Sequence, residues 1–250
     1  MVFRVIARLD VKPPNLVKGI HLEGVRKLGK PETFAERYYA QGIDEIIYQD
    51  VVASLYGRSS IAALVEETAK QVFVPITVGG GIRSIDDIQT MLRSGADKIS
   101  INTMAIRQPR LIYEAARLFG VQCITVALEV ASKGNHHWEP LIDSGREHTN
   151  LDAQDWAREV VDLGAGELLV TSIAAEGTRK GFDFSFGDRL LGQFNVPILI
   201  HGGAGSAADI VEAAQRGYSG AVIASALHYE LTTIEEIKNK LVQANIEVRQ

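Results

Sequence analysis

The chain has 250 residues, 46% hydrophobic and 23% charged, a globular composition that excludes a disordered protein. A formal net charge of −5 offers no basic surface for nucleic acid or an anionic membrane, and a lone cysteine, Cys123, excludes an internal disulfide and is typical of a reducing compartment. Arg4 and Arg8 interrupt the apolar start, and no apolar run is long enough to span a bilayer. We therefore expect a cytoplasmic protein that binds neither nucleic acid nor membrane.

Short apolar, β-rich runs alternate with amphipathic helical patterns along the whole chain. Because parallel strands need crossover connections, this alternation predicts a parallel sheet. Eight repeats in this length favour a closed (β/α)8 barrel over an open doubly wound sheet, as one domain over residues 1–250. The predicted strands are 3–9, 45–49, 75–78, 98–101, 123–128, 167–171, 197–200 and 220–223, and helical patterns cover 59–71, 84–93, 109–119, 151–163 and 206–216.

Two insertions break this rhythm, and both follow strands, so we expect them at the carboxyl-end rim of the barrel. Residues 12–30 have little hydrophobic periodicity, and residues 132–148 predict a hairpin that carries Trp138. His136 and His137 are adjacent in that hairpin, so their side chains should diverge. We expect no metal site and no cofactor.

The chain also contains an internal repeat. Residues 78–88 align with residues 200–210 without a gap, an offset of 122 positions, and the same offset relates 45–50 to 167–172 and Gly95 to Gly217. Asp10 matches Glu129 at an offset of 119. Since twice 122 nearly exhausts the chain, the repeat predicts two half-barrels of four βα units each, related by a pseudo-twofold axis.

Each half carries a glycine-rich turn between a strand and a helix. Glycine lets backbone N–H groups approach an anion, and the helix N-terminus adds a favourable dipole. One such turn can have a purely steric reason, but two in symmetric positions predict a substrate with a phosphate at each end. The candidate phosphate-binding residues are Gly80, Gly81, Asn102 and Thr103 in one half, and Gly202, Gly203, Ala224 and Ser225 in the other.

Asp10 and Glu129 end the first and fifth strands, which should face each other across the mouth. Two carboxyl groups there suit general acid–base catalysis, although a single one could cap a helix or accept a hydrogen bond from a loop. Asp50 and Thr171 are further candidate substrate-binding residues at strand ends. Lys18 in the first insertion is either a substrate clamp or a solvated lysine.

The residues resemble the HisF family, the cyclase subunits of imidazole glycerol phosphate synthase in histidine biosynthesis, over essentially the full length. Matching motifs are Arg-Leu-Asp10-Val-Lys, Leu-Val-Lys18-Gly, Asp44-Glu45 with Asp50 and Ala53-Ser54, Val78-Gly-Gly-Gly-Ile, Gly95-Ala-Asp-Lys98 with Ile-Asn102-Thr, Gly164-Ala-Gly-Glu167 with Thr171-Ser172, Gly177-Thr178 and Gly203-Ala-Gly205. The sister isomerase of the pathway shares the duplicated barrel and both phosphate sites, but its first strand matches less well.

The resemblance implies a specific reaction. Family members take ammonia from a glutaminase subunit and add it to a phosphoribulosyl-formimino aminoimidazole carboxamide ribonucleotide. The products are imidazole glycerol phosphate and aminoimidazole carboxamide ribotide. The two catalytic aspartates of the family fall on Asp10 and Glu129, and its substrate lysine falls on Lys18.

Four charged residues at strand beginnings share the amino-end face: Arg4, Glu45, Lys98 and Glu167. Their charges balance, so a stabilising cluster is one interpretation. In HisF-like proteins the matching positions form a salt-bridged gate where ammonia enters. The resemblance therefore implies that a HisH-like glutaminase docks on this face.

Arg8, Gln49, Glu129 and His201 depart from the family pattern, which usually has a small thiol, an aliphatic residue, an aspartate and a serine there. Strand alternation directs all four into the upper barrel. We expect Arg8 to pair with Glu129 and lower its pKa. Pro13-Pro14 should stiffen the first insertion. Three alternatives stay open: a paralogue that delivers ammonia to another acceptor, such as a surface sugar being amidinated; an isomerase; or a non-enzymatic, glutaminase-binding scaffold.

Overall fold

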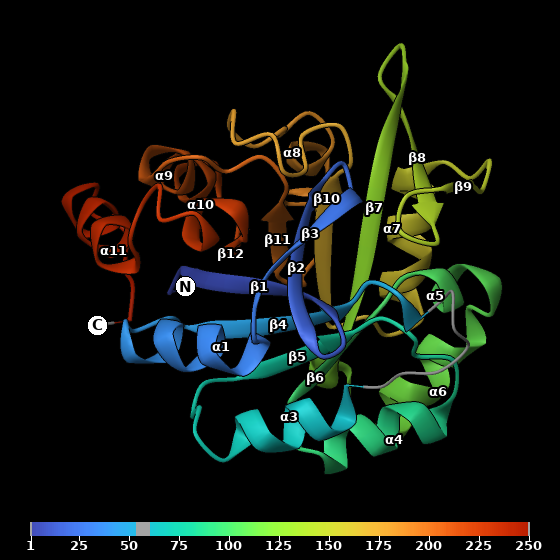
Figure 1. Cartoon of the computed structure of the whole chain (residues 1–250). Helices are drawn as coiled ribbons and strands as arrows, with labels where there is room; N and C mark the ends of the chain where they lie inside the picture. The colour runs from blue at the N-terminus through green and yellow to red at the C-terminus, as the bar shows by residue number, and fades with distance from the viewer. Residues whose placement is uncertain (1, 54–60, 250) are drawn as a thin grey trace.

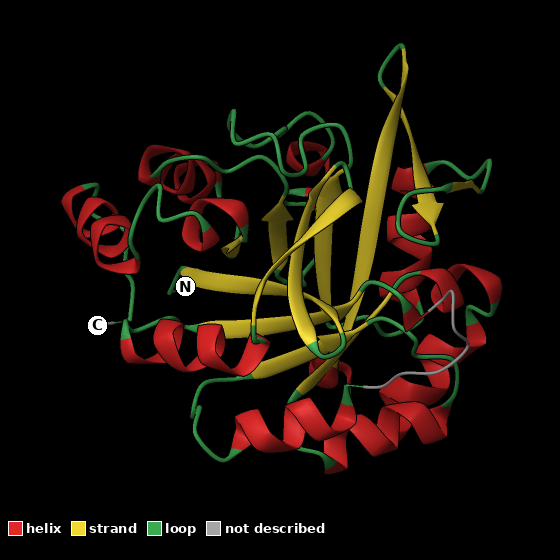
Figure 2. Cartoon of the chain, in the orientation of Figure 1, coloured by secondary structure: helices red, strands yellow, loops and turns green. Residues whose placement is uncertain are grey.

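A computed structural model describes residues 2–53 and 61–249. Ser54 of the HisF-like motif and the start of the helix predicted at 59–71 lie outside the described residues. Eight strands form a ring in which each pairs in parallel with its neighbours, and the pairing of β7 with β10 closes it (Figures 1 and 2). The predicted closed (β/α)8 barrel is thus confirmed. The ring strands are β1 (Arg4–Lys12), β4 (Glu45–Asp50), β5 (Ile76–Gly79), β6 (Lys98–Ile101), β7 (Ile124–Gly134), β10 (Glu167–Ser172), β11 (Ile198–His201) and β12 (Gly220–Ile223).

Helices follow the strands and cover the outside of the ring (Figure 2). They are α1 (Pro31–Ala40), α3 (Ala62–Ala69), α4 (Ile85–Arg93), α5 (Thr103–Arg107), α6 (Arg110–Phe119), α7 (Ala153–Asp162), α8 (Gly187–Leu190), α9 (Ala207–Arg216), α10 (Ser225–His228) and α11 (Ile234–Gln243). Cys123 lies in a short 3-10 turn before β7 and not, as predicted, inside the strand. Among the described residues, no helix combines the length and apolar character needed to cross a membrane.

Both insertions fold as β-hairpins at the carboxyl ends of strands. The weak periodicity of the first predicted no strands, but it contains β2 (Asn15–Ile20) and β3 (Glu23–Gly29), because β2 pairs antiparallel with the end of β1. The second is the predicted hairpin, in which β8 (His137–Ile142) pairs with an extended β7 and with β9 (Glu147–His148). Figure 1 shows the β7–β8 hairpin rising away from the barrel.

Backbone angles at equivalent positions agree with the internal repeat. Ser84 and Ser206, the N-caps of α4 and α9, have φ/ψ of −146°/166° and −145°/164°. Asn102 and Ala224, which follow β6 and β12, share an unusual conformation of −123°/−80° and −126°/−83°. The two halves therefore present corresponding loops at the same rim.

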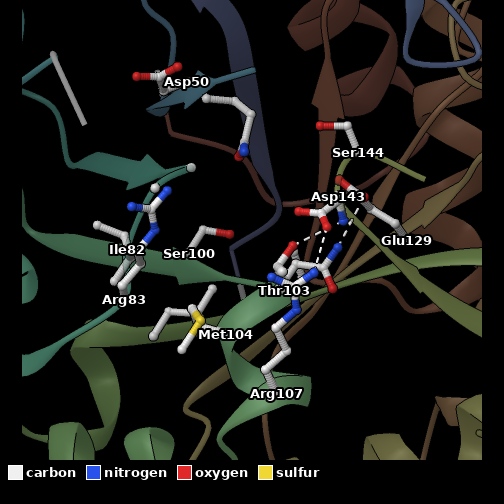
Figure 3. A pocket seen from close by; sticks show the side chains of 16 residues that line it. Asp50, Ile82, Arg83, Ser100, Thr103, Met104, Arg107, Glu129, Asp143 and Ser144 are labelled. Atoms are coloured by element: carbon white, nitrogen blue, oxygen red, sulfur yellow. Dashed lines mark hydrogen bonds and ion pairs between the residues drawn. The ribbon is translucent and has the colours of Figure 1, made fainter. Parts of the chain in front are cut away.

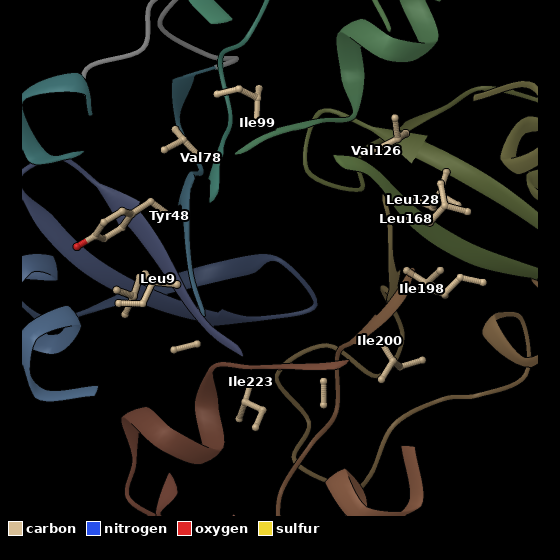
Figure 4. Packing of buried hydrophobic residues seen from close by; sticks show 14 of the residues in the cluster. Leu9, Tyr48, Val78, Ile99, Val126, Leu128, Leu168, Ile198, Ile200 and Ile223 are labelled. Carbon is tan, nitrogen blue, oxygen red and sulfur yellow. The ribbon is translucent and has the colours of Figure 1, made fainter. Parts of the chain in front are cut away.

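Alternation along the strands separates two apolar cores. Outward side chains such as Leu9, Val126 and Ile200 pack against the helices all around the ring (Figure 4). Inside the barrel, Ile6, Ile47, Ala127, Leu169, Leu199 and Val222 form a second buried cluster. Two residues before and after this apolar layer, the inward side chains of β1, β4, β7 and β10 are charged or polar, for instance Arg4 and Arg8 on β1. The barrel interior thus consists of a lower polar layer, an apolar middle layer and an upper polar layer.

Candidate active site

The glycine turns owe their sequence first to backbone geometry. Gly80 and Gly81 have φ of +89° and +75°, and Gly202 and Gly203 have φ of +97° and +108°. A Cβ on Gly80 would lie 2.1 Å from the Asp50 carbonyl oxygen, and one on Gly203 would lie 2.0 Å from the Gly181 carbonyl oxygen. Only glycine fits such positions without strain. The turns also line cavities, so the steric and the anion-binding interpretations are compatible.

The first half-barrel holds a cavity of about 90 Å³ at the carboxyl ends of β4 to β7. Figure 3 shows Asp50 and Glu129 on opposite sides of it, with Thr103 and Arg107 below. Asp50 Oδ1 accepts the backbone N–H groups of Val52 and Ala53 at 3.0 and 2.9 Å, so this carboxylate also caps its own loop. The lining includes all the candidates predicted for this half: Gly80, Gly81, Asn102 and Thr103, with Asp50.

The second half-barrel holds a smaller cavity of about 10 Å³. Its lining includes Lys18, Gly202, Gly203, Ala224 and Ser225, which were all predicted. Beside it, an open cavity of about 520 Å³ is lined by three cations, Lys18, Arg26 and Arg179. The sequence reasoning did not select the two arginines, although Arg26 lies in the first insertion and Arg179 just after the Gly177-Thr178 motif.

Asp10 and Glu129 line one common cavity, with Lys18 and Arg8 beside them. Asp10 is held by two cations: Arg8 Nε donates to its Oδ1 at 2.8 Å, and Lys18 Nζ donates to its Oδ2 at 3.2 Å. Burial alone would raise the pKa of Asp10, but the charges of Arg8 and Lys18 outweigh it and hold the pKa well below the ordinary value.

Glu129 has a different environment. Its Oε2 accepts a hydrogen bond from the neutral amide of Asn102 at 3.0 Å. Burial raises the pKa of Glu129; the charge of Arg8 offsets part of that rise, and Asp10 adds to it. The two carboxyl groups face the same cavity but have pKa values shifted in opposite directions: Asp10 loses its proton more readily than a free carboxyl group, and Glu129 less readily.

The expected pairing of Arg8 with Glu129 is wrong. Arg8 does point into the upper barrel and is buried, but its hydrogen-bonded ion pair is with Asp10, two residues further along the same face of β1. The pKa of Glu129 is accordingly raised and not lowered. The reason is geometric, because the guanidinium lies closest to the carboxylate that shares its own strand face.

Thr171 and His201 form part of the same upper layer. Both are buried, and the Thr171 hydroxyl lies 3.1 Å from His201 Nδ1. Arg8 lies 3.5 Å from the same nitrogen, and because a guanidinium only donates, that nitrogen is the acceptor. Burial, together with the charges of Arg8 and Lys18, lowers the pKa of His201. This imidazole is therefore neutral near pH 7.

Glu176 is a site residue that the sequence reasoning missed. It is fully buried, contacts Lys18 Nζ through Oε1, and accepts the backbone N–H of Leu22 through Oε2 at 2.8 Å. Its carbonyl oxygen also accepts the N–H of His21 at 3.0 Å. Glu176 therefore fastens the β2–β3 hairpin over the mouth. Its position directly before Gly177-Thr178 was the available signal.

At the opposite end, Arg4, Glu45, Lys98 and Glu167 meet in a closed ring. Arg4 contacts Glu45 at 2.9 Å and Glu167 at 2.5 Å, and Lys98 contacts the same two carboxylates at 2.7 and 3.1 Å. Thr77 and Thr125 donate to Glu45 and Glu167 as well. Burial would raise the pKa of Glu167, but Arg4 and Lys98 outweigh it and lower the pKa. Each charge of this lower ring is thus paired.

Fold and site together define a duplicated (β/α)8-barrel protein with two buried carboxyl groups that share a cavity at the carboxyl ends of its strands. Residues 4–233 match the family model described as "Histidine biosynthesis protein". The chain is 54% identical over 202 residues to an imidazole glycerol phosphate synthase subunit HisF from Legionella pneumophila, covering 81% of this chain and 95% of that relative. It is 43% identical over 247 residues to the HisF subunit from Bacillus cereus strain G9842, covering 98% of each. The chain belongs to the histidine biosynthesis protein family and, within it, to the HisF subunits of imidazole glycerol phosphate synthase.

Proposed function

We propose that this protein is the cyclase subunit of imidazole glycerol phosphate synthase. It adds ammonia to the phosphoribulosyl-formimino intermediate and releases imidazole glycerol phosphate and aminoimidazole carboxamide ribotide. The observation that carries this conclusion is the shared cavity of Asp10 and Glu129, in a chain related to HisF subunits over almost its full length. The isomerase, scaffold and surface-sugar alternatives are not favoured, because the relatives reported above are HisF subunits.

The residues of the mouth suit this chemistry. Addition of ammonia to a carbonyl carbon requires that the nitrogen lose a proton and that the oxygen gain one, which needs a base and an acid on one substrate. Asp10 and Glu129 are the two groups placed to supply them. The neutral His201 lies beside Arg8 and orients the upper layer without adding charge.

The substrate would lie across the mouth between the two glycine turns. One phosphate would bind at Gly80, Gly81, Asn102 and Thr103, and the other at Gly202, Gly203, Ala224 and Ser225, where the small second cavity adjoins the open one lined by Lys18, Arg26 and Arg179. Asp50 and Thr171 border this path. The symmetric placement of the turns supports a substrate with two terminal phosphates.

Ammonia would come from a HisH-like glutaminase on the amino-end face. The lower ring lies at this face, beside an open cavity of about 400 Å³ lined by Val2, Arg4 and Glu167. Exposed apolar residues lie at the same end of the barrel: Phe73, shortly before β5, is 71% exposed, and Leu118 and Val121, between α6 and β7, are 64% and 51% exposed. Exposed apolar residues together with a charged centre on one face support a protein partner here.

Turnover of the histidine-pathway intermediate with ammonium salt, without any partner, tests the proposed activity directly. We expect both products in equal amounts. Absence of turnover at saturating ammonium, with the chain folded, would overturn the assignment.

The docking face is tested by Phe73→Glu. A charge at this position should lower glutamine-dependent turnover with a HisH-like glutaminase at least about 10-fold, because an interface position would then bury an unpaired carboxylate. Ammonium-dependent turnover should stay within about 2-fold. Leu151→Glu, on the opposite rim before α7, is the matched control. Equal loss with both nitrogen sources, or no loss at all, would contradict docking at this face.

A further inference from the structure

Among the residues that the structure describes, the upper layer contains more negative than positive side chains. Its described cations are Arg8 and Lys18, and its described carboxyl groups are Asp10, Glu129 and Glu176, all of them buried. Both cations contact Asp10 or Glu176, so those two carboxylates are each neutralised by a direct ion pair. Glu129 is left with the Asn102 amide, which carries no charge.

Arg8 enlarges the difference between the two carboxyl groups, because it gives Asp10 a second ion-pair partner beside Lys18. It extends along the inner face of β1 and donates through Nε to Asp10, while its NH1 group lies near His201. A small side chain at this position would leave Lys18 as the ion-pair partner of both Asp10 and Glu176. The two opposed carboxyl groups would then be more alike in their surroundings.

We propose that Arg8 is a positioning residue that divides the work of the two carboxyl groups: it keeps Asp10 as the ionised base and leaves Glu129 as the proton donor. This inference rests on the proposed cyclase function. Arg8 departs from the small thiol that HisF-like sequences usually carry, so the inference concerns this chain.

With Asp10 as base and Glu129 as acid, every proton in the first step of the reaction has a donor and an acceptor. As the nitrogen of ammonia forms a bond to the substrate's carbonyl carbon, Asp10 accepts a proton from that nitrogen. The π electron pair of the carbonyl moves onto oxygen, which takes the proton of Glu129. Loss of water then reverses both transfers: Asp10 protonates the departing hydroxyl, and Glu129 takes a proton from nitrogen as the C=N bond forms. Both side chains return to their starting states.

Lys18 adds to the effect of Arg8 by lowering the pKa of Asp10, and Glu176 adds to the effect of Asp10 by raising the pKa of Glu129. Asp10 faces Lys18 from β2, His201 from β11, Glu129 from β7 and His228 from α10, and Glu176, after β10, contacts Lys18. Burial lowers the pKa of both histidines, so they stay uncharged near neutral pH and do not replace Arg8. Glu129 faces Arg8, Asp10, Asn102 and Glu176.

Carboxyl NMR titration of the wild-type chain and of Arg8→Met tests the division directly, with Asp10→Asn and Glu129→Gln to assign the two signals. In the wild type, Glu129 should titrate at a higher pH than Asp10, and Arg8→Met should move the Asp10 transition upward by about one pH unit or more. The reverse order in the wild type, or an Asp10 transition unmoved by Arg8→Met, would overturn the proposal.

Kinetics provide the second readout. With ammonium, Arg8→Met should lower kcat at pH 7 by about 10- to 100-fold and move the acid limb of the kcat/KM profile upward, whereas Arg8→Lys should recover most of both. Arg158→Met, on the exposed face of α7, is the control and should match the wild type. If Arg8→Met does not fold, Arg8→Lys and the wild-type titration order still decide. Because the titration needs no turnover, failure of the cyclase assignment and failure of this inference give different results.

Discussion

The two polar layers of the barrel interior contain similar charged side chains but differ in the ratio of positive to negative charges. In the lower ring, Arg4 and Lys98 meet Glu45 and Glu167, and every charge has two partners of opposite sign. In the described part of the upper layer, two cations meet three carboxyl groups, and the hydrogen-bond partner of Glu129 is the neutral Asn102 amide. A balanced buried cluster stabilises its charged forms, whereas an unbalanced one shifts a pKa and creates a proton donor. We therefore propose that the proton chemistry takes place at the upper layer and that the lower ring has a structural or gating role.

The largest effect should come from Asp10→Asn. An amide cannot accept the proton from nitrogen, so ammonium-dependent kcat should fall by about 10³-fold, within the usual range for loss of a general base. Steady-state turnover measures it, and Asp155→Asn on the exposed face of α7 is the matched control. A variant that keeps more than about a tenth of the activity would place the base elsewhere and break the contrast between the layers.

Acid pH should lower the stability of the fold through a buried histidine near the upper layer. Burial lowers the pKa of His228 to about 4, from 6.5 in the unfolded chain, while its Nδ1 stays 2.7 Å from the Tyr38 hydroxyl. Since the folded pKa is depressed for a base, the unfolded state takes up the proton first, and stability is lost as pH falls from 6.5 towards 4. The loss should reach about 3 kcal/mol over that window.

His228→Phe should flatten this part of the stability profile, measured by urea unfolding at several pH values, even if the variant is less stable at pH 7. His137→Phe, at an exposed position of the β7–β8 hairpin, should keep the wild-type slope. An unchanged slope in His228→Phe would mean that other groups carry the acid sensitivity.

The smallest effect should come from Glu45→Gln in the lower ring. The change leaves Arg4 and Lys98 with one carboxylate between them, and we expect a loss of about 2 kcal/mol, less than for a fully buried pair because Arg4 is 25% exposed. Ammonium-dependent kcat should stay within about 3-fold, since no group at the mouth changes. Chemical denaturation and turnover check both, with Glu159→Gln on α7 as control. A loss of kcat as large as that of Asp10→Asn would contradict the conclusion that only the upper layer takes part in the proton chemistry.

Much of the fold was predictable because its signals are local. All eight ring strands and the β7–β8 hairpin lie where periodicity and turn residues predicted them. The β2–β3 hairpin was missed because its pairing with β1 depends on contacts that the weak periodicity of residues 12–30 does not reveal. Among the site candidates, the two glycine turns and the opposed carboxyl groups were found through the repeat, whereas Glu176 lies outside the aligned segments.

The sequence by itself determined the number of strands, the duplication, and the inward direction of Arg4, Arg8 and Asp10, since strand alternation follows from backbone geometry alone. Only the tertiary structure decided the hydrogen-bond partners. Arg8 donates to Asp10 and not to Glu129, Glu129 accepts from Asn102, and Glu176 accepts from Lys18. Partner choice depends on distances of a few ångströms between residues that are as many as 158 positions apart. Electrostatic roles follow those distances, because the interaction of buried charges grows steeply as they approach each other.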